Sequence, residues 1–127
     1  MIFQRTIKNE VRATGVGLHS GEKVNLTLKP AKEGHGIVFK RVDQENNTQI
    51  RVEPNAVVET RLCSTIGNKE FKIATVEHLM SALSASGIDN IIIELSGSEI
   101  PIMDGSSISF IHLIKSAVIV EQLQPKE

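Results

Sequence analysis

The sequence predicts an α+β fold, a two-layer sandwich in which two helices pack on one face of one mainly antiparallel sheet. Segments with the two-residue alternation of strands occupy the first half of the chain. Segments with the 3.6-residue apolar spacing of helices follow in the second half. Strands grouped before helices are typical of this fold class. With 127 residues, 40% of them apolar, the chain has the size of one compact domain with a buried core.

The strands of the first half are recognised by alternation and by the residues that stop them. Val24 to Lys29 alternates apolar and polar side chains, and Pro30 ends the segment because proline cannot donate to a sheet ladder. A tight turn is expected at Gly67-Asn68, between two short strands. The predicted strands are residues 24–29, 36–42, 49–53, 62–66 and 70–73.

The pattern then changes to a helical period. Thr75 is a suitable N-cap, and an apolar stripe ends at Gly87, a typical C-terminal residue. The stripe consists of Val76, Leu79, Met80 and Leu83. An apolar run, 88–95, predicts a strand that is covered on both faces or central in the sheet. A second helix is expected from about Ser106 through Val118. The polar end, 121–127, is the one segment for which disorder is expected.

Composition excludes several classes of function. A net charge of −1, with no Trp and no Tyr, argues against a nucleic-acid-binding surface. The single cysteine excludes an internal disulfide and fits a reducing cytosol. The N-terminus lacks the apolar run of a signal peptide, and no apolar stretch is long enough for a transmembrane segment. We therefore expect a cytoplasmic protein.

Glu77 and His78 form the most informative pair for chemistry. Both fall in the first turn of the predicted helix, where the helix dipole favours a carboxylate. Neighbouring helical residues point about 100° apart, so His78 could bind a metal while Glu77 accepts a proton from bound water. An isolated Glu-His pair is more often structural, and the His-Glu-x-x-His pattern of metalloproteases is absent because Ala82 follows His78 by four residues.

Three other segments carry weaker signals. Thr14 to Gly21 is glycine-rich, but a strand rather than a helix follows, so a hairpin is expected instead of a nucleotide loop. His19 in that segment could contact a substrate or simply be solvated. Asp104 precedes a helix start and could be a capping residue. Cys63 is most simply a small buried hydrophobe.

Taken together and in order, these motifs resemble the UDP-3-O-acyl-N-acetylglucosamine deacetylase family, the zinc hydrolases of lipid A synthesis. The matching segments extend through most of the chain. They are Thr14–Gly21, Thr60–Ser64, Ala74–Leu79, Gly87–Asn90 and Glu99–Ser106. Two positions depart from the family pattern: Arg61 replaces a common Met, and Ser109 replaces a common Pro.

The resemblance implies the roles of particular residues. Glu77 corresponds to the catalytic general base and His78 to one of three zinc ligands. The implied substrate-contacting or site-supporting residues are Leu18, His19, Leu62, Cys63 and Asp104. The implied cofactor is Zn²⁺ and the implied substrate is UDP-3-O-acyl-N-acetylglucosamine, which loses its N-acetyl group as acetate.

The resemblance also implies that residues 1–127 are the first of two α+β domains, with the fold named ribosomal protein S5 domain 2-like. In the family the active site lies between the two domains. The other two zinc ligands, a His and an Asp four residues apart, lie in the second domain, which is absent here and is the expected partner. The fragment alone should therefore be inactive. The alternative is a non-catalytic module, derived from that domain, that binds a partner or a ligand.

Overall fold

In a computed structural model the chain forms two helices and ten strands among the residues described here, 2–17, 21–43, 49–52, 57–59, 64–67, 72–74, 76–97, 99–101 and 108–126. The strands are β1 (Phe3–Ile7), β2 (Val11–Val16), β3 (Lys23–Pro30), β4 (Ile37–Arg41), β5 (Gln49–Val52), β6 (Val57–Glu59), β7 (Ser64–Gly67), β8 (Lys72–Ala74), β9 (Ile91–Leu95) and β10 (Ile119–Pro125). The helices are α1 (Glu77–Ala85) and α2 (Ile108–Ser116).

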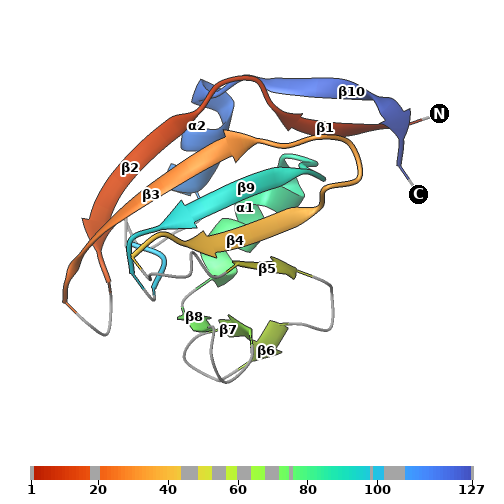
Figure 1. Cartoon of the computed structure of the whole chain (residues 1–127). Helices are drawn as coiled ribbons and strands as arrows, with labels where there is room; N and C mark the ends of the chain where they lie inside the picture. Colours follow the sequence, from red (N-terminus) through yellow and green to blue (C-terminus); the bar gives the residue numbers. More distant parts are fainter. Residues whose placement is uncertain are drawn as a thin grey trace.

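The main sheet has five strands in the order β2-β3-β9-β4-β5. All neighbouring pairs are antiparallel except β4 and β9, which are parallel. Both helices cover one face of this sheet, and the small sheet β6-β7-β8 lies beyond the β5 edge (Figure 1). The predicted α+β two-layer sandwich with a mainly antiparallel sheet is confirmed.

The core lies between the main sheet and the two helices. β9 alternates, with Ile91, Ile93 and Leu95 buried while Ile92 and Glu94 are half-buried on the opposite face. The predicted central position of this strand is confirmed, since β9 lies between β3 and β4. Its outer face is half-buried, so the strand is not covered on both faces. The helices bring their own buried apolar residues to the same core: Val76, Leu79, Ala82, Leu83, Phe110 and Ile114.

Helix α1 ends in a Schellman motif, as the glycine at position 87 predicted. The Ile88 N–H donates to the Leu83 carbonyl at 3.0 Å, and the Gly87 N–H donates to the Ser84 carbonyl at 3.1 Å. Gly87 has φ +68°, which glycine adopts without the penalty of a Cβ. At the other end Val76, rather than Thr75, occupies the N-cap position and makes no side-chain cap. Thr75 lies outside the described residues.

Two predictions for the C-terminal third were wrong. Helix α2 stops at Ser116, and Val118 has φ +67°, so it lies in the turn after the helix. The backbone there is held by Lys8, whose N–H donates to the Val118 carbonyl at 2.7 Å. The polar segment expected to be disordered forms β10, which pairs antiparallel with β1. A partner strand from the other end of the chain satisfies its backbone groups.

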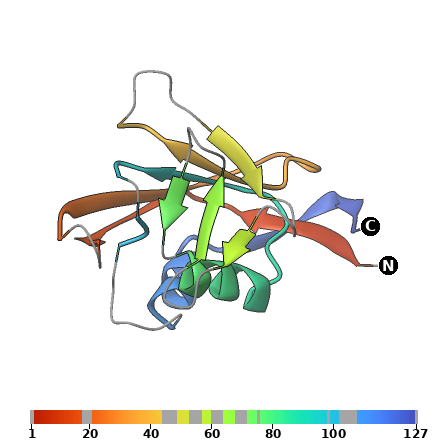
Figure 2. The same cartoon turned by 90° about the horizontal axis from the view of Figure 1, so that it is seen from below.

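Figure 2 shows the small sheet from below, next to the helical layer. Its strands β7 and β8 pair antiparallel, which confirms the hairpin predicted around Gly67-Asn68, although Asn68 lies outside the described residues. β8 ends at Ala74 and α1 begins at Glu77. The hairpin therefore lies just before α1 in the chain, and α1 begins with Glu77 and His78, the residues predicted to act in catalysis.

Candidate functional site

The start of α1 brings Glu77 and His78 together, as the sequence predicted. Glu77 is the first residue of the helix and His78 the second. Val76 and Leu79 on either side are fully buried, which fixes the helix on the sheet at this point. Glu77 is half-buried and His78 is exposed, consistent with side chains that point in different directions from successive helical positions.

The electrostatics of a helix start suit an acidic side chain. The first N–H groups of α1 have no partner within the helix and carry the positive end of its dipole. Glu77 is the acidic residue of this first turn. Its carboxylate is thus placed where negative charge is stabilised, while the neighbouring imidazole remains open to solvent and to a ligand.

The described residues alone do not supply the ligands that a catalytic zinc ion requires. Catalytic zinc sites in proteins use three protein ligands and one open position. Within the described ranges, no group of three or more His, Cys, Asp or Glu side chains could hold a metal ion. An exposed imidazole next to a carboxylate fits one ligand and one base of such a site. The remaining ligands would have to come from outside the described residues.

The other predicted site residues cannot be placed. Leu18, His19, Leu62, Cys63 and Asp104 lie outside the described residues. On either side of residues 18–20, β2 pairs antiparallel with β3, and the Gly17 N–H donates to the Glu22 carbonyl at 2.9 Å. A strand, not a helix, therefore follows the glycine-rich segment, and the predicted pairing of a β-hairpin is confirmed for β2 and β3.

The polar residues that follow the other end of α1 were not among the predicted site residues. Asn90 is buried, with 1% of its surface exposed, and it joins four segments of the chain. The available signal was an amide side chain next to the apolar run Ile91 to Ile93, three residues after the terminating glycine.

The fold and the pair at the start of α1 define an α+β domain that presents a carboxylate and an imidazole together, a combination used by metal-dependent hydrolases. Comparison with known proteins gives the family. A family model described as UDP-3-O-acyl N-acetylglycosamine deacetylase matches residues 4–127. The chain therefore belongs to the UDP-3-O-acyl-N-acetylglucosamine deacetylase family, and it corresponds to the N-terminal part of its relatives.

Three relatives illustrate the match. Proteins named UDP-3-O-acyl-N-acetylglucosamine deacetylase from Xanthomonas oryzae pv. oryzae (strain PXO99A), Xanthomonas euvesicatoria pv. vesicatoria (strain 85-10) and Stenotrophomonas maltophilia (strain K279a) are each 56% identical over 126 residues. The aligned region covers 99% of this chain and 42% of each relative. The chain thus spans less than half the length of the proteins it matches.

Neither helix in the part of the chain that the structure describes is long and apolar enough to cross a membrane.

Proposed function

We propose that this chain is the first domain of a zinc-dependent deacetylase that hydrolyses the N-acetyl group of UDP-3-O-acyl-N-acetylglucosamine, in lipid A synthesis. The observation that carries the proposal is the placement of Glu77 and His78 at the start of α1, in a chain 56% identical to relatives of that name. The substrate class follows from the relatives' name. The proposed location is the cytoplasm.

Each of the two residues has a separate part in the reaction. A bound zinc ion would lower the pKa of its coordinated water to about 7. The neutral imidazole of His78 would supply one of three protein ligands. The Glu77 carboxylate would accept the proton of the attacking water. The water oxygen then bonds to the acetyl carbon, the carbon–nitrogen bond breaks, and the products are acetate and a free amine that has gained a proton.

The experiment uses a chimera in which this chain replaces the matched 42% of the Xanthomonas oryzae relative. We expect the chimera to bind zinc and to release acetate from the substrate. Glu77→Ala should lower kcat by about 10²- to 10⁴-fold, the usual contribution of a general base, with zinc content unchanged. Near-full activity of the Glu77→Ala chimera with zinc retained would refute the assigned base.

The same preparation tests the alternative of a non-catalytic module, which is favoured by the lack of a three-donor group among the described residues. The 127-residue chain alone should neither retain zinc on dialysis nor release acetate. Adding the rest of the relative as a separate polypeptide should restore both. If the two pieces do not associate, and the chimera is also inactive, the chain is a binding module and not half of an enzyme.

A further inference from the structure

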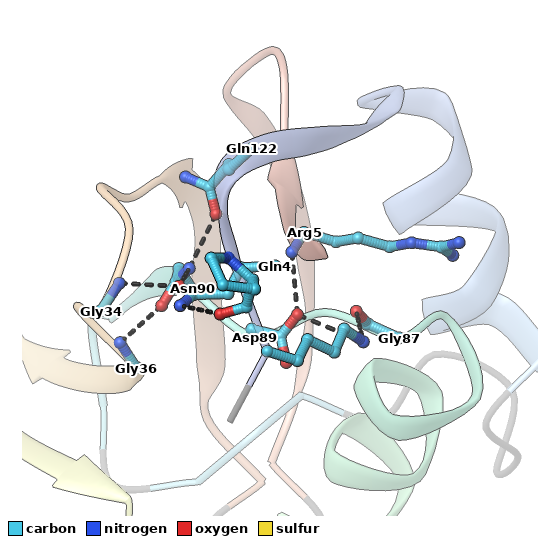
Figure 3. Close-up of polar contacts among 10 residues, drawn as sticks. Gln4, Arg5, Gly34, Gly36, Gly87, Asp89, Asn90 and Gln122 are labelled. Atoms are coloured by element: carbon cyan, nitrogen blue, oxygen red, sulfur yellow. Dashed lines mark hydrogen bonds and ion pairs between the residues drawn. The ribbon is translucent and has the colours of Figure 1, made fainter. Parts of the chain in front are cut away.

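Three amide side chains meet at the start of β9, which follows the end of α1 that is remote from Glu77. The Asn90 Oδ1 accepts the Gly36 N–H at 2.9 Å. The Asn90 Nδ2 donates to Gln4 Oε1 at 2.8 Å and to Gln122 Oε1 at 2.7 Å, so both of its hydrogens are used. Figure 3 shows Asn90 between Gln4, Gln122 and Gly36. We call these three amides, Gln4, Asn90 and Gln122, the amide cluster.

Backbone groups fix the orientation of every amide in the cluster. The Gln4 Oε1 also accepts the Gly34 N–H at 2.8 Å, and its Nε2 donates to the Pro125 carbonyl at 3.0 Å. The Gln122 Nε2 donates to the Ala31 carbonyl at 2.8 Å. None of the three side chains can exchange its oxygen and nitrogen without losing a backbone bond. The cluster therefore has only one arrangement in which all of these hydrogen bonds form, so it favours one relative position of the segments that it connects.

The turn between α1 and β9 is joined to β1 by backbone bonds beside the cluster. The N–H groups of Asp89 and Asn90 both donate to the Arg5 carbonyl, at 2.9 and 3.1 Å, and the Arg5 N–H donates to Asp89 Oδ2 at 2.8 Å. The Lys126 Nζ lies 3.3 Å from both Asp89 Oδ2 and the Gly87 carbonyl oxygen. The residue after β10 is thus bonded directly to the turn that follows α1.

The cluster and the bonds beside it consequently connect β10 to the turn that follows α1. Helix α1 leads away from it to Glu77 and His78, and β10 is the last strand before the point where the relatives continue. A nine-residue helix is about 13 Å long, so a tilt of about 4° at its end displaces the other end by about 1 Å. Misplacement by 1 Å can lower a rate about 100-fold.

We propose that Asn90 is a positioning residue, which holds α1 and β10 in one frame so that the part of the polypeptide beyond this chain meets Glu77 and His78 in a fixed orientation. This inference rests on the proposed function, since it concerns how the two parts of that site are aligned. Asn90 acts through the helix and the strand and touches no substrate.

The test compares Asn90→Ala with Ile114→Ala in the chimera described above. Ile114 is fully buried on α2, away from the cluster, and serves as the matched control for lost stability. At a temperature well below both unfolding transitions, we expect Asn90→Ala to lower kcat about 10- to 100-fold with KM within threefold. Zinc affinity should fall about tenfold or more. Ile114→Ala should leave kcat and zinc affinity within twofold.

A second pair of variants separates hydrogen bonding from shape and from misfolding. Asn90→Asp keeps the shape of the side chain but replaces two donated bonds by contacts between oxygens, so its loss of kcat should equal or exceed that of Asn90→Ala. Gln122→Met removes only the hydrogen bonds that β10 contributes to the cluster, and we expect a three- to tenfold loss of kcat. Full activity of Asn90→Asp or of Gln122→Met would overturn the proposal.

Hydrogen exchange in the zinc-free chimera gives a readout that does not depend on activity. Asn90→Ala should speed exchange of the β10 amides at least tenfold more than Ile114→Ala does. Equal exchange in the two variants, or unchanged kcat and zinc affinity in Asn90→Ala, would overturn the positioning role. An inactive wild-type chimera would refute the proposed function instead, while the exchange measurement would still decide whether Asn90 holds β10.

Discussion

Helices α1 and α2 have the same length and cover the same face of the main sheet, but they differ at both ends. α1 carries Glu77 in its first turn, whereas α2 has no acidic residue there. After α1 the chain turns through Gly87 at φ +68°, and after α2 it turns through Val118 at φ +67°. The same backbone conformation is thus reached with the most suitable residue in one case and an unsuitable one in the other.

The difference shows which features a helix in this domain can do without. α2 packs its apolar face on the core with no acidic residue in its first turn and no glycine at its end. An acidic first turn and a terminal glycine are therefore not general requirements for a helix on this sheet face. The proposed function gives Glu77 and His78 a chemical role, and the proposed positioning role of Asn90 concerns the bonds at the turn after α1.

The largest expected contrast is between His78 on α1 and His112 on α2, both of which are exposed. His78→Ala in the chimera should abolish zinc retention and lower kcat/KM by more than about 100-fold. Losing a residue that only hydrogen-bonds to a metal ligand already lowers metal affinity or activity about 10- to 100-fold, and losing the ligand itself should cost more. His112→Ala should stay within twofold of the parent. Zinc content after dialysis and initial rates measure both. Stoichiometric zinc in His78→Ala would contradict its role as a ligand.

The helices should be equal in what they contribute to the core. Leu79 on α1 and Ile114 on α2 are both fully buried, so Leu79→Ala and Ile114→Ala should each lower the free energy of unfolding by about 2–5 kcal/mol. Urea denaturation of the chimera's first domain measures the loss. Ser81→Ala, at an exposed position of α1, is the control and should change it by less than about 0.5 kcal/mol. A loss below about 1 kcal/mol for only one of the two variants would show that the two helices contribute unequally to the core.

A smaller effect is expected where α1 ends. Gly87→Ala should lower the free energy of unfolding by about 1–2 kcal/mol, the cost of placing a Cβ in the left-handed region. The added Cβ would lie 3.4 Å from Arg5 Nη1, an ordinary contact, so the loss should come from backbone conformation. Ser84→Ala, on the exposed side of the last turn, is the control. An unchanged urea midpoint in Gly87→Ala would show that the turn can readjust.

The smallest expected effect has the opposite sign. Val118→Gly should raise the free energy of unfolding by about 0.5 kcal/mol, because relief of the left-handed valine outweighs the added freedom of glycine in the unfolded chain. Val42 is similarly exposed and is not in that conformation, so Val42→Gly should be destabilising. If both substitutions destabilise equally, the end of α2 is not strained.

The parts of the fold that were predicted correctly have local patterns of their own. β3 and β4 alternate or are apolar between turn residues, and α1 has an apolar stripe closed by Gly87. β1 and β10 have no such pattern, since Phe-Gln-Arg-Thr-Ile and Ile-Val-Glu-Gln-Leu-Gln-Pro mix apolar and polar residues without regular alternation. These two strands form because they pair with each other. The paired residues are as distant in sequence as Gln4 and Pro125, so the pairing cannot be predicted from a short stretch of sequence.

The candidate site was predicted unevenly for the same reason. Glu77 and His78 could be identified because they are adjacent in sequence and occur at a recognisable helix start. The amide cluster could not, because Gln4, Asn90 and Gln122 come from three distant segments and each looks like an ordinary polar residue. Its importance depends on burial, and burial follows from the tertiary fold.

The pairing of β1 with β10 also has a consequence for biosynthesis. The Gln4 side chain bonds to the Pro125 carbonyl, 121 residues later. At a translation rate of roughly 5–20 residues per second, β1 waits for roughly 6–25 seconds before its partner strand has been made. During that interval neither β1 nor the amide cluster can be completed. On the ribosome, α1 therefore acquires its final support only after nearly all of this domain has emerged.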